Sequence, residues 1–199
     1  MSSRCDSVRA RLLRIGFEDS AQAADELARL GQGAESLIAL LAATADPDQA
    51  LAGLVRLAER AEPALVRELA DDEGTAMRLL SVLGASQALT DHLCRHPEHW
   101  RELADPFLGS TRPAAYALRG ALLTAVGADP ADDRPTATLT YAEAVDALRV
   151  EYRRLLTRLT ARDLAHHVGV DDASAELSDL AAGTLEAALA IARAGTADS

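Results

Sequence analysis

The chain has 199 residues, of which 49% are hydrophobic and only 3% aromatic. Ala, Leu, Arg and Glu dominate while Val, Ile and Thr are scarce, a composition typical of helices and not of strands. The formal net charge of −11 argues against a basic, phosphate-tracking surface, so we expect neither nucleic acid nor a membrane as a partner. We predict an all-α protein, an irregular array of about ten helices bounded by start and stop signals.

Short helices are predicted in the first half of the chain. Asp46 caps the clearest of them, with Pro47 at its first position and an apolar stripe behind it. Gly84 is expected to end another helix in the left-handed conformation. The predicted helices begin at 19 or 20, 34, 47, 63, 75, 86 and 97.

Longer helices are predicted in the second half. Two loops rich in Pro, Gly and Asp precede them, at 104–113 and 127–139, and the second loop is expected to be disordered. Thr140 and Glu143 form a capping box that opens the longest predicted helix, which runs through residue 164. The last predicted helix covers 172–194, with Leu177, Leu180, Leu185, Leu189 and Ile191 as its apolar positions. We expect a short-helix subdomain over 1–105 and a long-helix subdomain over 111–199.

The two cysteines, Cys5 and Cys94, occur in a chain without a signal-peptide hydrophobic run. This usage indicates a reduced, cytoplasmic setting. No segment approaches the roughly 18 apolar residues that are needed to span a bilayer.

Three of the five histidines lie close together in the sequence. His92, His96 and His99 have the i, i+4, i+7 spacing that would bring three imidazoles to one face of an unbroken helix, as a zinc site requires. Pro97 is expected to end the helix before His99, and no fourth ligand is recognisable. We therefore interpret the stretch as a structural helix-proline-helix corner and predict no metal ligand.

Other candidate groups also favour structural roles. Asp46 and Asp48 form an Asp-x-Asp pair, but the proline between them, at a helix start, favours caps over magnesium ligands. His166 and His167 lie near a predicted helix end, where an imidazolium interacts favourably with the helix dipole. No nucleophile elbow or glycine-rich phosphate loop occurs, so no residue is predicted to be catalytic or to bind a cofactor.

Arginines flank the apolar stripe of the longest predicted helix on both sides. One row consists of Arg154, Arg158 and Arg162, and the other consists of Arg149 and Arg153. Like charges at i, i+4 cost about 0.2–0.5 kcal/mol each, so the first row implies a negative partner. Either the protein's own carboxylates supply it, or the row docks an acidic domain or binds nucleotide phosphate.

Three ordered stretches resemble a single family. They are LGASQALTDHLCRHPEHW at 83–100, LRVEYRRLLTRLTARDL at 148–164 and ELSDLAAGTLEAALAIAR at 176–193. The stretches at 16–31 and 46–60 also fit, so the resemblance covers nearly the whole chain. The family is the bifunctional glutamine synthetase adenylyltransferase/adenylyl-removing enzyme.

The resemblance implies a large cytoplasmic enzyme with two nucleotidyltransferase domains. One removes AMP from a tyrosine of glutamine synthetase by phosphorolysis, giving ADP, and the other adds AMP from ATP. Both use magnesium, and a PII-class signalling protein shifts the balance between them. In such domains a helical stretch precedes a sheet that bears Gly-Ser and Asp-x-Asp motifs.

This sequence stops at Ser199, about where that sheet would begin. The resemblance therefore implies the N-terminal helical part of the adenylyl-removing half, inactive by itself and without a cofactor of its own. Its expected partners are the nucleotidyltransferase domain that it lacks, glutamine synthetase and the signalling protein. A free-standing helical adaptor for a protein partner is the alternative, because tandem short helices without catalytic residues also fit that class.

Overall fold

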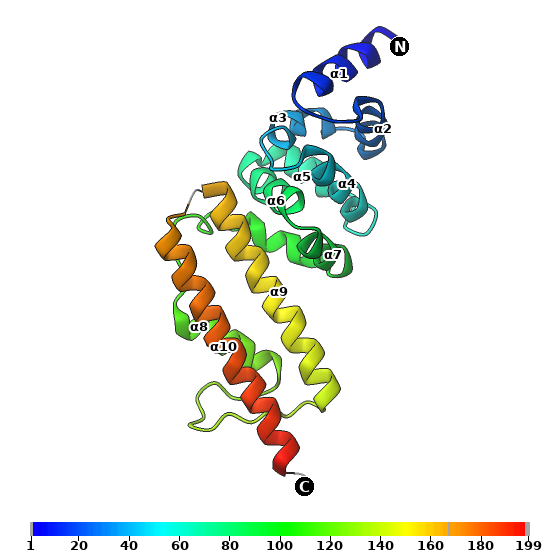
Figure 1. Ribbon diagram of the computed structural model, residues 1–199. Coiled ribbons are helices and arrows are strands. Elements are labelled where there is room, and N and C mark those ends of the chain that lie inside the picture. The colour runs from blue at the N-terminus through cyan, green and yellow to red at the C-terminus, as the bar shows by residue number, and fades with distance from the viewer. Residues whose placement is uncertain (1, 167, 198–199) are drawn as a thin grey trace. The chain divides into compact units, whose positions relative to one another are not determined.

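The computed structural model describes the backbone of residues 2–166 and 168–197, and side chains over 8–196 apart from 167. The side chains of Cys5 and His167 therefore lie outside the described residues. Every regular element in the described part is a helix (Figure 1), which confirms the all-α prediction. None of these helices is both long enough and apolar enough to cross a membrane.

The chain forms two compact units, residues 1–106 and 107–199. The first unit is a sequential array of short helices, in which α4 contacts α2, α6 and α7, and α6 contacts α3, α5 and η2. Its elements are α1 (Ser2–Arg14), α2 (Ser20–Leu30), η1 (Ala34–Leu37), α3 (Ile38–Leu41), α4 (Pro47–Ala58), α5 (Leu65–Asp71), α6 (Glu73–Ala85), α7 (Gln87–Arg95) and η2 (Pro97–Ala104).

Side-chain caps begin several of these helices where the sequence predicts them. The Asp46 carboxylate accepts the backbone N–H of Gln49 at 2.9 Å, and the Ser86 hydroxyl accepts that of Leu89 at 3.3 Å. These bonds satisfy N–H groups that have no partner inside the helix. Asp48 instead accepts the backbone N–H of Glu18 at 3.0 Å, which links the start of α4 to the segment before α2.

The prediction for Gly84 is wrong. Helix α6 continues through Gly84 to Ala85, and the glycine is buried. A β-carbon at this position would lie 2.9 Å from Cβ of Thr44 and 3.0 Å from the carbonyl oxygen of Asp46. Glycine is therefore required for a close approach between α6 and the segment before α4, and not for a left-handed turn.

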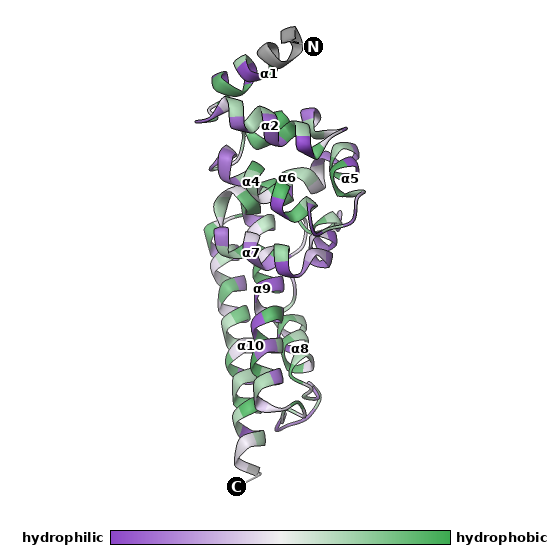
Figure 2. Cartoon of the chain, turned by 90° about the vertical axis from the view of Figure 1, so that its right-hand side faces the viewer, coloured by the Kyte–Doolittle hydropathy of each residue, from purple (hydrophilic) through white to green (hydrophobic). Residues whose placement is uncertain are grey.

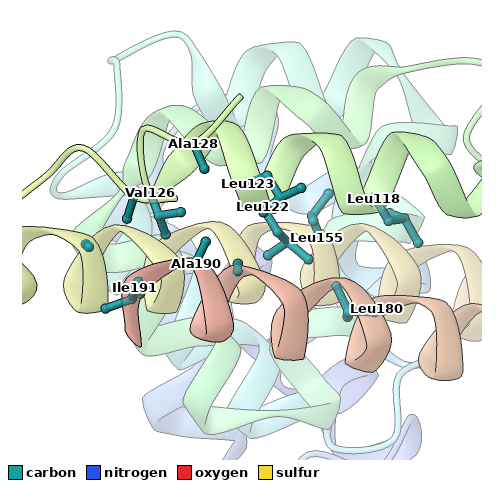
Figure 3. Packing of buried hydrophobic residues seen from close by; sticks show 12 residues of the cluster. Leu118, Leu122, Leu123, Val126, Ala128, Leu155, Leu180, Ala190 and Ile191 are labelled. Carbon is teal, nitrogen blue, oxygen red and sulfur yellow. The ribbon is translucent and has the colours of Figure 1, made fainter. Parts of the chain in front are cut away.

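The second unit consists of α8 (Ala115–Ala125), α9 (Tyr141–His166) and α10 (Val170–Ala197), each in contact with the other two. Figure 3 shows their apolar side chains gathered between the helices. The buried cluster consists of Leu118, Leu122, Leu123, Val126, Ala128, Ala137, Ala144, Leu155, Leu180, Ala187, Ala190 and Ile191. Because α9 and α10 are long and joined by a short link, they form an antiparallel hairpin (Figure 1) against which α8 packs.

The loop at 127–139 is ordered, so the prediction of disorder is wrong. Ala137 donates its backbone N–H to the carbonyl of Ala190 at 3.1 Å. Arg119 donates to the carbonyl of Pro130 at 2.8 Å, and Arg193 donates to that of Pro135 at 3.0 Å. These bonds fasten the loop to α8 and α10, a long-range effect that loop composition does not reveal.

The apolar positions predicted for the last helix divide between two faces. Leu180 and Ile191 are buried in the core of the unit, whereas Leu177, Leu185 and Leu189 are exposed. Ala187 and Ala190 fill the core positions in their place. Small residues let α10 lie close to its neighbours, so the larger leucines remain outside.

Candidate functional site

The first row of arginines on α9 begins with an ion pair to a residue of the same helix. Arg154 donates from Nε to a carboxylate oxygen of Glu151 at 2.7 Å. The two residues are three positions apart, a spacing at which side chains on a helix meet. One member of the row is thus neutralised within its own turn.

Arg162 is buried at the other end of the row. Its Nη2 donates to the Glu176 carboxylate on α10, and the two side chains are only 7% and 5% exposed. The Arg162 Nε is buried without a hydrogen-bond partner among the described residues. A charge so far from water requires its counter-charge, so this pair ties the two arms of the α9–α10 hairpin together.

Arginines from α8 and from the segment before it also bind α10. Arg112 pairs with Asp179, and Arg119 pairs with Glu186. The helices approach closely here, because a β-carbon on Gly183 would lie 2.9 Å from Leu122 Cδ1. The acidic residues of α10 between 176 and 186 are therefore used as counter-ions that position the helix.

A groove lies between α9 and α10. Its volume is about 280 Å³, and it is lined by Leu148, Arg149, Tyr152, Arg153 and Thr184. Its walls are mainly apolar, and its arginines are those of the second row. The sequence predicted these arginines only as one side of an amphipathic helix. It did not indicate a groove.

The three histidines of the first unit lie together despite Pro97. The ring centroids of His92, His96 and His99 are 5.1–5.4 Å apart. His92 is buried, and its Nε2 lies 3.0 Å from Nδ1 of His99. The expected helix-proline-helix corner is present, and the ring of His99 nevertheless lies beside the other two. No group of three or more His, Cys, Asp or Glu side chains among the described residues is placed to hold a metal ion.

Near this cluster, burial raises the pKa of the Cys94 thiol and keeps it protonated. Cys94 is buried and forms no disulfide. A protonated, buried thiol is a poor nucleophile, so Cys94 acts as a small core residue.

His166 is the last residue of α9, in agreement with its predicted position near a helix end. Its ring packs on the backbone of Gly109, where a β-carbon would lie 2.6 Å from the imidazole. This contact is one that the sequence did not indicate.

A buried arginine in the first unit was not predicted from the sequence. Arg78 on α6 donates from Nε to the carbonyl of Leu103 at 2.6 Å and from Nη2 to the hydroxyl of Thr75 at 3.2 Å. Its partner in η2 is 25 residues away, so no local spacing could reveal it. Arg78 serves to join α6 and η2.

A family model described as glutamate-ammonia ligase adenylyltransferase matches residues 76–198. The chain belongs to this family. The match includes the histidine cluster, both arginine rows and all of α8, and it reaches the end of α10. The resemblance inferred from the three sequence stretches is thereby confirmed.

Curated members of the glutamate-ammonia ligase adenylyltransferase family are similar to nearly all of this chain. The bifunctional glutamine synthetase adenylyltransferase/adenylyl-removing enzyme of Streptomyces avermitilis is 40% identical over 208 residues, covering 98% of this chain and 19% of that protein. The protein of the same name from Streptomyces coelicolor is 42% identical over 200 residues, covering 96% and 18%. The chain thus spans about a fifth of the length of the curated relatives that it matches. No solved structure matches it significantly.

Proposed function

We propose that this chain is a non-catalytic helical part of a bifunctional glutamine synthetase adenylyltransferase/adenylyl-removing enzyme. The observation that carries the proposal is the similarity of 94% or more of the chain to about a fifth of several proteins with that name. We assign it to the half that removes AMP from a tyrosine of glutamine synthetase by phosphorolysis, on the strength of the ordered motifs at 83–100 and 148–164.

The acidic residues of the second unit support a structural role. Glu151, Glu176, Asp179 and Glu186 each pair with an arginine of their own unit. Magnesium prefers carboxylate oxygens that remain free to bind it, and these four are occupied. Magnesium, ATP and ADP therefore belong, in this proposal, to the nucleotidyltransferase domains of the full-length cytoplasmic enzyme.

We further propose that the row Arg154, Arg158 and Arg162 docks the catalytic sheet of the full-length enzyme or holds substrate phosphate. Arg154 keeps about a quarter of its side chain exposed beside Glu151, so it can turn toward a second acceptor. A guanidinium can donate to two acceptors at once, which suits both roles.

The proposal on the arginine row is tested in the full-length enzyme. The variant Arg154→Gln/Arg158→Gln leaves the buried Arg162 in place and is compared with Arg67→Gln, which replaces an exposed arginine of α5. We expect the double variant to slow AMP removal at least about tenfold, as the loss of charge-assisted bonds in a transition state does, and the control to leave it unchanged. Equal rates for all three proteins would reject the role.

The assignment of the part is tested by comparing the isolated chain with the full-length enzyme. Adenylylated glutamine synthetase is incubated with inorganic phosphate, and ADP is measured. We expect ADP only from the full-length enzyme, with PII-class protein altering its rate. ADP formation by the isolated chain would contradict the proposal that it is non-catalytic.

The assignment to one half is tested by a variant that disturbs the second unit, such as Gly183→Leu. In the full-length enzyme we expect AMP removal to fall and AMP addition to persist, because the two reactions belong to separate domains. Loss of addition with intact removal would place this part in the other half.

A further inference from the structure

The exposed surface of α10 is unusual for a protein in which 26% of residues are charged. Every exposed residue between positions 174 and 192 is Ser, Ala or Leu. They are Ser174, Leu177, Ser178, Ala181, Ala182, Leu185, Ala188, Leu189 and Ala192. Ala and Leu give most of this helix its green colour in Figure 2. A helix that is apolar on both its core face and its outer face is typical of one buried on both sides.

This exposed surface continues into the groove between α9 and α10. Thr184 lines the groove. Ala181 and Ala188 lie three and four positions from it, so they share its face of the helix. At 100° per residue this face is opposite the one formed by Gly183 and Glu186, which contact α8.

The unit thus has α8 on one side of the α9–α10 hairpin and an apolar groove on the other. A fourth helix placed in such a groove would complete a four-helix arrangement, in which each helix buries its apolar face against two neighbours. We define the extended groove as the lining residues together with Ala181, Leu185 and Ala188. Its shape suits the binding of one helix.

The charged residues at the groove indicate which side chains a helix bound there would need. Arg149 is paired with Asp146, and both side chains are largely exposed. Arg153 lines the groove and makes no ion pair within the described residues. A half-buried guanidinium favours a carboxylate at hydrogen-bonding distance. The groove therefore suits an amphipathic helix that has apolar side chains and a carboxylate opposite Arg153.

A second copy of this chain does not supply that chemistry. The three carboxylates of α10 between 174 and 192 each pair with an arginine of their own unit, so two copies meeting there would leave Arg153 unpaired. A helix face of this length covers roughly 300 Å², given a rise of 1.5 Å per residue and a width of about 10 Å. A stable interface between separate proteins needs about 800 Å² per partner. A tethered segment needs less, because its effective concentration reaches the millimolar range.

We propose that the extended groove seats an amphipathic, carboxylate-bearing helix from the part of the full-length polypeptide outside these 199 residues. The proposal rests on the proposed function, namely that the chain is one part of a longer enzyme. Support comes from the relatives, in which about four fifths of the length lies outside the matching region.

The bound helix can be identified by photo-cross-linking in the full-length enzyme. A photoreactive benzoyl-phenylalanine is placed at position 185, where it replaces an exposed leucine of the extended groove. The matched control carries the same group at Ala131, an exposed residue on the loop after α8. After irradiation and proteolysis, we expect position 185 to be joined to one peptide of the same polypeptide from outside residues 1–199. Yield from position 131 should be at background.

Charge reversal tests the carboxylate. Arg153→Glu should lower the cross-linking yield from position 185 about fivefold or more, because it sets like charges against each other. Arg67→Glu, which alters an exposed arginine of α5, should leave the yield unchanged. Replacing the acidic residue of the captured peptide by Arg should restore the yield in the Arg153→Glu background.

A cross-link between two copies, a cross-link to a different protein, or a yield no higher than that of the control would each overturn the proposal. These outcomes are independent of the proposed function. If the enzyme removes AMP normally but gives no intrachain cross-link, the proposal of a helix in the extended groove fails and the proposed function stands. An isolated chain that forms ADP rejects the proposed function whatever the cross-link shows.

Discussion

The Nε2 atom of His92 lies 3.0 Å from Nδ1 of His99, although Pro97 separates the helices that carry them. The 3-10 helix η2 starts directly at Pro97, and His99 donates its backbone N–H to the carbonyl of His96 at 3.1 Å. This tight turn leaves His99 beside α7, where its ring meets the buried ring of His92. The proline ends one helix without redirecting the chain away from it.

The bond between these imidazoles should contribute to the stability of the first unit. His99→Ala removes a partially buried hydrogen bond, and we expect it to lower the free energy of unfolding by about 1–2 kcal/mol. Trp100 is the single tryptophan and is buried in this unit, so its fluorescence during urea unfolding reports the change. His96→Ala serves as the control, because His96 contacts the other rings but shares no hydrogen bond with them. Equal losses from both variants would contradict this role.

The cap of α6 should make the first unit sensitive to acid. The Asp72 carboxylate accepts the hydroxyl of Thr75 at 2.7 Å and its backbone N–H at 3.1 Å, and these bonds lower the pKa of Asp72. A carboxyl whose pKa is lower in the folded state stabilises that state above its unfolded pKa, near 3.9. The contribution is lost as pH falls through the folded pKa.

We therefore expect Asp72→Ala to cost about 1 kcal/mol at neutral pH, the usual value of an N-cap. The difference from the natural chain should shrink in urea unfolding as pH falls below ~3.9, because the unfolded chain then binds a proton at this carboxyl before the folded chain does. Asp71→Ala is the control, because Asp71 is the exposed neighbour at the end of α5. A cost that does not depend on pH would show that the charge of Asp72 is not involved.

The buried ion pair of the second unit should be costly to break. Arg162→Met leaves Glu176 buried without its counter-charge, and we expect a loss of about 3–5 kcal/mol. The double variant Arg162→Met/Glu176→Leu should recover most of that loss, because no charge is then stranded. All three tyrosines lie in this unit, so tyrosine emission follows its unfolding.

The matched control for that experiment is Arg149→Met. Arg149 pairs with Asp146 on the same helix, and their side chains are 67% and 77% exposed. A surface pair of this kind contributes about 0–1 kcal/mol. If Arg162→Met proved no more damaging than Arg149→Met, the pair with Glu176 would not join α9 to α10 as described.

Two glycines of the second unit should respond to alanine in opposite ways. Gly183→Ala places a β-carbon 2.9 Å from Leu122 Cδ1 and 3.1 Å from Arg119 Cα, so we expect a loss of about 1–3 kcal/mol. Gly120→Ala meets nothing within 4 Å and lies inside α8, so it should gain up to about 1 kcal/mol from helix propensity. Thermal unfolding of both variants checks the signs. A gain at Gly183 would show that α8 and α10 do not need this close approach.

The sequence by itself determined the class of the fold and many of its helix boundaries. Caps such as Asp46 and the Thr140–Glu143 pair act through hydrogen bonds within about one helical turn, so the residues that decide them are neighbours in the chain. The family is likewise visible in the order of short stretches. These are local properties, and no packing is needed to recognise them.

Only the tertiary structure decided how these helices are used. Leu180 and Leu185 have the same chemistry and both belong to α10, yet one is buried and the other 71% exposed, because only the first faces α8 and α9. Gly84 and Arg162 depend in the same way on residues that are distant in sequence or on another helix. A one-dimensional pattern records that a face is apolar or charged. It does not record which neighbour comes to cover that face, since this depends on side chains brought together by folding.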